Sequence, residues 1–192
     1  MKGEDVRAGT DKVRALVTTS LFAALAVVVS KLKVPLPVPH MKIEGSLAVS
    51  LFLASSFGNF KYGWYVEIIK YILNLTSSHT FGLGETVDLL TGLLAVWSFV
   101  FLRRRFRLPS KKSFHFVFVL EQIVFTLLGN FVINLVAWPV YFWLFNLKFT
   151  ARMLLGCVLA GEICSAAKVG LACVVAAFLQ GKLPRSLQKI FY

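Results

Sequence analysis

The sequence predicts an all-α polytopic membrane protein with one domain, and three observations support this. Of the 192 residues, 57% are hydrophobic and only 16% are charged, whereas about a quarter are charged in a typical soluble domain. The mean hydropathy is +0.74, and the apolar residues fall into long runs. One water-soluble core cannot bury so much apolar surface. Together these features exclude a soluble globular enzyme, a disordered linker and, despite the net charge of +12, a DNA-binding domain.

The apolar runs predict six transmembrane helices, because about 20 apolar residues are needed to cross the hydrocarbon core. The third run is short, and the fifth is too long for one crossing unless it is tilted or kinked. Pro139 predicts a bend there, because proline removes a backbone donor. Only Gly58–Lys61 separates the second run from the third, which predicts a tight helical hairpin. The expected spans are 13–30, 43–60, 63–75, 85–102, 114–145 and 153–180, in a single domain over 1–192.

The basic residues predict the orientation of the chain in the cell membrane. With six helices both termini lie on one side, and that side carries most of the lysines and arginines. Basic loops face the cytoplasm, so we expect both termini to be cytoplasmic. The strongest anchor is the loop Arg103–Lys112, which we interpret as a topology signal in contact with anionic membrane lipid rather than with a specific partner.

Charged side chains inside a helix are costly in the membrane and face a cavity or a partner. Glu67 and Lys70 are three residues apart, which favours a self-neutralising pair over contact with a ligand. Glu121 is expected to bond a facing helix or a basic partner. Lys168 lies too deep to reach the interface, so we expect it to pair with an acid or to meet an anionic ligand. Glu162 accompanies it on the same small-residue helix.

The outer ends of the last three helices carry further candidate binding residues. The loop at 76–84 is polar, contains His79 and leads into Glu85 and Asp88. These two acids either stabilise a helix N-terminus or form the rim of a binding site under that loop. Asn130 and Asn134 share one helix face, which predicts either interhelical hydrogen bonds or contact with a ligand. Trp138 and Tyr141 follow on the same helix and belong to an interfacial belt or stack on a ligand ring.

Several classes of chemistry have no counterpart in the sequence. There is no GxxxxGK[ST] loop for ATP, no HExxH motif and no GxSxG motif. The three histidines are scattered, and the three cysteines include no CxxC pair. We therefore expect no enzymatic activity, no metal, no cofactor and no nucleic-acid partner.

The first helix carries small residues at three- and four-residue steps, which lets another helix approach closely. The stripe either packs within the chain or docks another membrane subunit. Its members are Ala15, Thr19, Ala23, Ala26 and Ser30, with Ser20 and Ala24 as a second pair beside them.

At this point the chain resembles the S components of energy-coupling factor (ECF) vitamin transporters. Residues 20–37, SLFAALAVVVSKLKVPLP, are similar to the family's first helix with its AxxxA docking motif and the outer loop after it. Residues 65–75, YVEIIKYILNL, are similar to the third helix of riboflavin-type members. The order then continues with GLGE at 82–85, a fourth helix and a basic loop.

The resemblance implies a substrate-binding membrane subunit that captures a vitamin with the outer ends of its last three helices. It also implies docking, through the first three helices, on a transmembrane coupling subunit that two ATPase subunits drive. The implied docking residues are Ala15, Thr19, Ser20, Ala23 and Ala24, and the implied substrate residues are His79, Glu85, Asp88, Asn130, Asn134, Trp138, Tyr141 and Lys168.

The riboflavin-type pattern is incomplete here, because Ser165 stands where that pattern has an Asn or Asp before the lysine. A deep lysine with amide side chains suits a ligand that has a carboxylate together with amide or hydroxyl groups. Pantothenate is therefore the first candidate, and riboflavin or a pyrimidine precursor is the alternative. The alternative class of function is a membrane scaffold whose polar residues only join helices.

Overall fold

The chain folds into a bundle of helices with one short β-hairpin. The computed structural model describes residues 2–35, 42–76, 82–105, 116–148 and 150–182. The predicted all-α class and the six helices are confirmed, and the two three-residue strands were not predicted. The elements are α1 (Lys2–Lys31), β1 (Lys33–Pro35), β2 (Lys42–Glu44), α2 (Ser46–Ser56), α3 (Phe60–Leu75), α4 (Leu83–Arg105), α5 (Phe116–Leu144) and α6 (Ala151–Lys182), with β1 and β2 antiparallel.

Four of the described helices, α1, α4, α5 and α6, are long and apolar enough to cross a membrane. Their outer faces carry apolar side chains that are exposed in the isolated chain, such as Leu128 and Ile163, as expected for surfaces that contact lipid. The fifth stretch is a single helix, because Pro139 lies inside α5 and does not end it.

The second predicted span, 43–60, is longer than the helix that forms there. Residues Lys42–Glu44 belong to β2, and α2 has only 11 residues. At 1.5 Å per residue α2 is about 16 Å long, which is well short of a hydrocarbon core of about 30 Å. Every residue of α2 is buried. The predicted tight connection to α3 is present, with Asn59 accepting a hydrogen bond from the Lys61 N–H.

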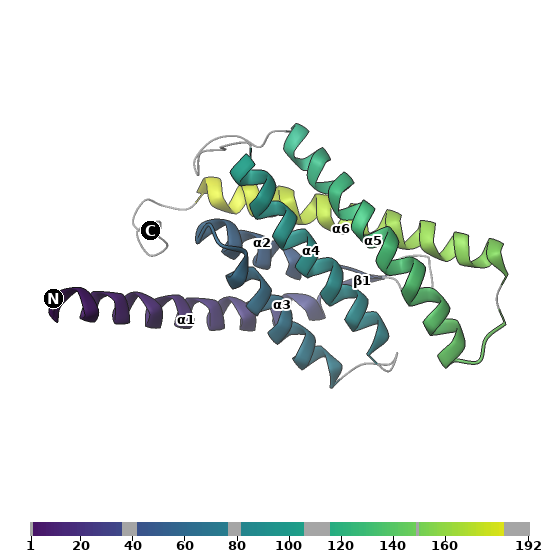
Figure 1. The fold of residues 1–192 in the computed structure, drawn as a ribbon, viewed down its shortest axis with the longest axis horizontal. Coiled ribbons are helices and arrows are strands. Elements are labelled where there is room, and N and C mark those ends of the chain that lie inside the picture. The colour runs from purple at the N-terminus through teal and green to yellow at the C-terminus, as the bar shows by residue number, and fades with distance from the viewer. Residues whose placement is uncertain (1, 36–41, 77–81, 106–115, 149, 183–192) are drawn as a thin grey trace.

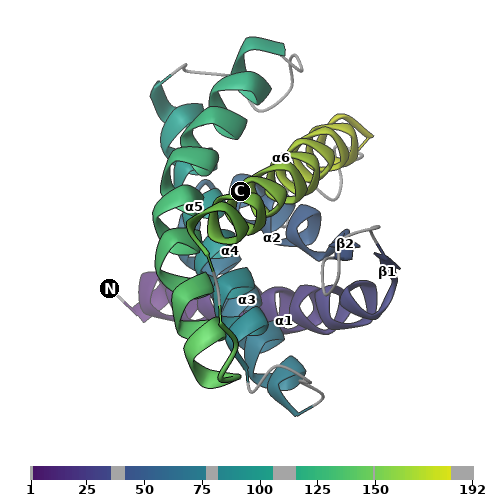
Figure 2. The same ribbon diagram turned by 90° about the vertical axis from the view of Figure 1, so that its right-hand side faces the viewer.

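The arrangement places α2 at the centre of the molecule, in contact with α1, α3, α4 and α6 (Figure 1). In addition, α4 packs against α5, and α5 packs against α6. An apolar core joins α2, α4, α5 and α6 through residues such as Leu51, Phe99 and Val169, and a smaller one joins α1, α2 and α3 through Ala23, Leu53 and others. Figure 2 shows the β1–β2 hairpin between α1 and α6, next to the start of α2.

The two ends of the bundle differ in chemistry. At the arginine end, the Arg103 side chain donates to the Ser55 carbonyl (3.2 Å) and to Gln180 (3.3 Å), and Arg104 donates to the Gly58 carbonyl (2.8 Å). This end therefore holds the C-terminal ends of α2, α4 and α6. At the opposite, hairpin end, Lys31 of α1 donates to Asn74 of α3 (3.1 Å). Successive helices thus run in alternating directions.

Candidate functional site

Five charged side chains from four elements form the ionic cluster, four of them buried and Asp88 half-buried. They are Glu44 of β2, Glu67 and Lys70 of α3, Asp88 of α4 and Lys168 of α6. Lys70 Nζ lies 2.7 Å from Glu67, 2.8 Å from Asp88 and 3.2 Å from Glu44. Lys168 Nζ contacts Asp88 and lies 3.4 Å from Glu44. The predicted Glu67–Lys70 pair is therefore present, and it belongs to a larger network of three acids and two lysines.

Two serines on one face of α2 complete the ionic cluster. Ser46 donates to Glu44 (2.7 Å) and accepts from Lys70 (3.2 Å), and Ser50 donates to Glu67 (2.6 Å). Their spacing of four residues puts both hydroxyls on the side of α2 that faces α3. These bonds explain why a fully buried apolar helix carries serines, since a buried carboxylate needs partners for its oxygens.

A second group of polar side chains, the amide seam, joins α4, α5 and α6. Its members are Thr91, Asn130, Asn134, Glu162 and Ser165. The Thr91 hydroxyl donates to the Asn130 Oδ1 (2.6 Å), and the Asn130 Nδ2 donates to Glu162 Oε1 (3.0 Å) and Ser165 (2.9 Å). Asn134 Nδ2 also donates to Glu162 Oε1 (2.9 Å). Both asparagines are buried, so they face the helix interface and not the lipid.

Gly161 lets α5 and α6 approach closely enough for these bonds. A Cβ at this position would stand 3.0 Å from the Asn134 amide nitrogen, so any larger residue would push that side chain away from Glu162.

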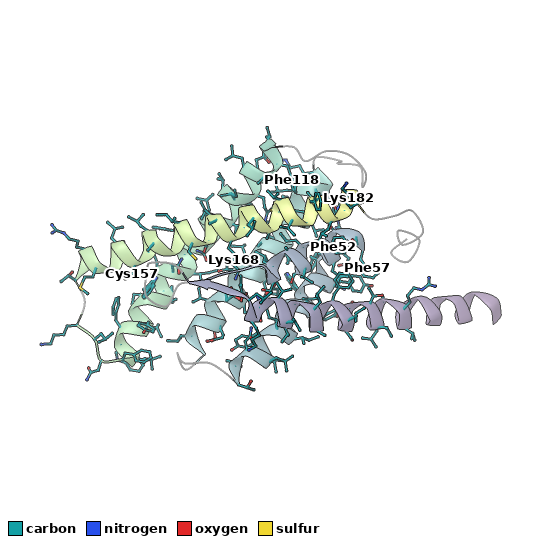
Figure 3. The ribbon with its side chains drawn as sticks, turned by 180° about the vertical axis from the view of Figure 1, so that it is seen from behind. Phe52, Phe57, Phe118, Cys157, Lys168 and Lys182 are labelled. Carbon is teal, nitrogen blue, oxygen red and sulfur yellow. The ribbon has the colours of Figure 1, made fainter. Side chains whose placement is uncertain are left out.

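The ionic cluster and the amide seam adjoin one another. Asp88 and Thr91 are three residues apart on α4, and Ser165 and Lys168 are three apart on α6, so each helix carries both groups on one face. Figure 3 shows Lys168 on the part of α6 that passes the strands.

Beyond the amide seam, toward the hairpin end, α5 carries aromatic side chains. Trp138 is one turn beyond Asn134 and meets Tyr141 edge to face, with ring centroids 5.7 Å apart. Tyr141 also packs on Phe145 at 4.5 Å. Trp138 and Tyr141 are half-buried, so part of each side chain remains accessible in the isolated chain.

The structure brings together several of the predicted site residues. Asn130 and Asn134 share Glu162, which agrees with the interpretation as interhelical hydrogen bonds, and Lys168 meets Asp88. Lys168 therefore pairs with acids of the chain itself. Glu85 is half-buried in the first turn of α4. His79 lies outside the described residues.

The predicted docking residues of α1 divide into two faces. Thr19 and Ala23 are buried within the chain, and Ala15 is half-buried. These three lie on the side of α1 that packs within the bundle, and their role in docking a partner stays a prediction. Ser20 and Ala24 are exposed, and of the predicted docking residues this pair is the most accessible to another protein.

Sequence reasoning did not assign Glu44, Ser46, Ser50 or Thr91 to the site, and it did not assign a ligand role to Glu162. Glu44 was visible as an acid in an apolar region, but its partners are distant in sequence. The serines gave a signal in retrospect, because Ser46 and Ser50 are one turn apart in a helix that is otherwise apolar.

The fold and these two groups define an integral membrane protein with a polar interior enclosed by apolar helices. The chain belongs to the family of ECF transporter substrate-specific components, whose family model matches residues 14–185. Proteins of this family are substrate-binding transport subunits and are not enzymes.

A solved structure described as "Structure and mechanism of the S component of a bacterial ECF transporter" has the same fold. It is 17% identical in sequence, has a TM-score of 0.65, and the match covers 85% of this chain and 92% of that one. No curated protein sequence is a significant match.

Proposed function

We propose that this S component binds a vitamin at the amide seam and releases it when a transmembrane coupling subunit, driven by two ATPase subunits, engages it. The observation that supports this most directly is the amide seam itself. It places buried amide, hydroxyl and carboxylate groups from three helices at one position. Polar groups of this kind are costly in a membrane, and a few of them meeting in an apolar surrounding are typical of small-molecule sites.

The hairpin end is proposed to face outward in the cell membrane, and the arginine end and both termini to face the cytoplasm. The alternating helix directions and the arginines at the end of α4 support this orientation, because basic residues flank helices on the cytoplasmic side. The vitamin would then enter from the outside, past Trp138 and Tyr141.

The groups of the chain that are free to bind a ligand indicate which vitamin the protein binds. The sequence favours pantothenate because Lys168 would meet its carboxylate. In the structure Lys168 already contacts Asp88 and Glu44, so a ligand carboxylate would have to displace one of them. The amide seam offers amide and hydroxyl groups and a carboxylate instead. We therefore place riboflavin or a pyrimidine precursor ahead of pantothenate and keep pantothenate as the comparison ligand.

Binding of radiolabelled riboflavin, a hydroxymethylpyrimidine and pantothenate to the purified chain tests this function. Asn134→Ala removes a seam amide, and we expect about a tenfold loss of affinity, which is the usual effect of one lost hydrogen bond. The control is Gln122→Ala on the same helix. Gln122 is buried and bonds Ala95 and Ser98 outside the seam, so its loss should lower stability and leave the affinity unchanged.

The scaffold alternative makes the opposite prediction for the same variants. If the polar residues only join helices, Asn134→Ala and Gln122→Ala will both change stability alone. Absence of micromolar or tighter binding of every ligand to the wild-type chain would reject the transport function.

A further inference from the structure

The two carboxylate oxygens of Glu162 are in unequal surroundings. Oε1 accepts two hydrogen bonds, from Asn130 (3.0 Å) and Asn134 (2.9 Å). Oε2 is also buried, and it has no hydrogen-bond partner among the residues that the structure describes. An unsatisfied buried acceptor is unfavourable. The position next to Oε2 is therefore suited to a donor that comes from outside these helices.

The interior of the described bundle provides no cation for Glu162. Lys70 and Lys168 are the buried lysines of this region, and both are engaged by the three acids of the ionic cluster. No lysine or arginine of the described segments forms an ion pair with Glu162. Because the acids already outnumber the lysines, an anionic ligand at Oε2 would add a like charge where nothing balances it.

Neighbouring hydrogen bonds hold Glu162 in place as an acceptor. The Thr91 hydroxyl occupies the Asn130 Oδ1, so the Asn130 N–H groups point toward Glu162 and Ser165. Both of these N–H groups end on Oε1, and a carboxylate oxygen accepts hydrogen bonds. Oε2 therefore discriminates between ligands that have an N–H donor and ligands that do not.

The aromatic residues beyond the seam indicate the shape of that ligand. Trp138 and Tyr141 are half-buried on α5, one and two turns from Asn134. Aromatic faces bind flat rings and cationic rings well. We propose that the ligand is a nitrogen heterocycle that donates a ring N–H or an amino group to Glu162 Oε2. This inference rests on the proposed function and names the class of substrate for the same site.

The test measures dissociation constants of the purified full chain for three heterocycles with such a donor: thiamine, pyridoxamine and riboflavin. Each is paired with an analogue that lacks that N–H donor: 4'-desaminothiamine, 4-deoxypyridoxine and 3-methylriboflavin. Pantothenate is the anionic control. We expect one of the three donors to bind at micromolar or lower concentration, its analogue to bind about 10- to 100-fold more weakly, and pantothenate not to bind, since a charge-assisted hydrogen bond is lost.

The variant Glu162→Gln removes the charge at nearly constant size and should weaken binding of the same donor ligand about 10- to 100-fold. Its binding of the donor-free analogue should change little. The matched control is Glu121→Gln, a substitution of the same kind on α5 outside the seam. If Glu162→Gln does not fold, the wild-type comparison of each donor with its analogue still decides the matter.

The outcomes separate this inference from the function on which it rests. Binding of pantothenate alone, or equal affinity of a donor ligand and its analogue, would overturn the inference and leave vitamin binding intact. Equal affinity of wild type and Glu162→Gln for the donor ligand would also overturn it. Failure of all the probes to bind wild type would overturn the proposed function as well.

Discussion

At the scale of single residues, Lys70 has the most demanding position in the molecule. Its ammonium group meets carboxylates from β2, α3 and α4, and it is only 2% exposed. A buried charge of this kind is tolerated because its partners neutralise it, and removal of one member leaves the others unpaired. The ionic cluster therefore stabilises the protein only when all of its members are present, and no single ion pair accounts for its effect.

Replacement of Lys70 by methionine should destabilise the protein by about 3–5 kcal/mol, because three carboxylates lose their shared cation. The matched control is Lys61→Met, since Lys61 is exposed on the same helix and exposed substitutions change stability by only about 0.5 kcal/mol. Thermal unfolding in detergent measures both. Similar melting temperatures for the two variants would contradict the account of the ionic cluster given above.

Residue-level prediction from the sequence succeeded where the partners are close along the chain. The Glu67–Lys70 pair follows from a spacing of three residues on one helix. The contact of Lys168 with Asp88 joins residues 80 positions apart, and no periodicity reveals which acid a buried lysine will meet. For the same reason Lys168 could be expected either to pair with an acid or to bind a ligand, and only the fold distinguished these alternatives.

At the scale of elements, the packing of α3 against α4 depends on a residue without a side chain. A Cβ on Gly92 would stand 2.7 Å from the Glu67 Oε2, which is closer than any normal contact. The absence of that atom lets Glu67 lie between the helices and reach Lys70. The ionic cluster and the spacing of these two helices are therefore linked at this position.

Gly92→Ala should lower stability by about 1–3 kcal/mol, since the added methyl group has to displace the Glu67 carboxylate. Gly156→Ala on α6 is the control. A Cβ there has no neighbour within 4 Å, and the better helix propensity of alanine should stabilise the protein by up to about 1 kcal/mol. The two unfolding midpoints, measured side by side, should move in opposite directions; a shift in the same direction would contradict the prediction.

Element boundaries were predictable for the long apolar helices and less so around α2. The fourth, fifth and sixth helices begin and end within three residues of the predicted limits. Hydropathy alone merged part of β2, α2 and the following turn into one span, because the apolar residues of α2 dominate that stretch. Antiparallel pairing with β1 takes Lys42–Glu44 out of the helix, and such pairing is a long-range event.

At the scale of the whole molecule, the exposed face of α1 with Ser20 and Ala24 is the surface proposed to dock the coupling subunit. Ala24→Trp should prevent co-purification with the coupling and ATPase subunits, because a large side chain blocks close helix approach. Vitamin binding by the isolated chain should be unchanged. The comparison is Val132→Trp on α5, where the side chain is 61% exposed.

Normal assembly of Ala24→Trp would reject this docking face, whereas loss of assembly in both tryptophan variants would indicate a general effect on folding.

The class of fold was predictable at this scale, because composition and the length of apolar runs report directly on a membrane environment. The sequence could not predict which small residues of α1 are buried in the bundle and which are exposed, since small residues favour close packing on either face of a helix.

The enclosure of α2 has a consequence for how the protein is made. A segment of 11 residues with four serines is a poor candidate for stable insertion by the translocon on its own, since insertion favours about 20 apolar residues. Its surroundings include α6, which leaves the ribosome only after α3, α4 and α5. Biogenesis must therefore hold α2 in a provisional location until α6 has been synthesised.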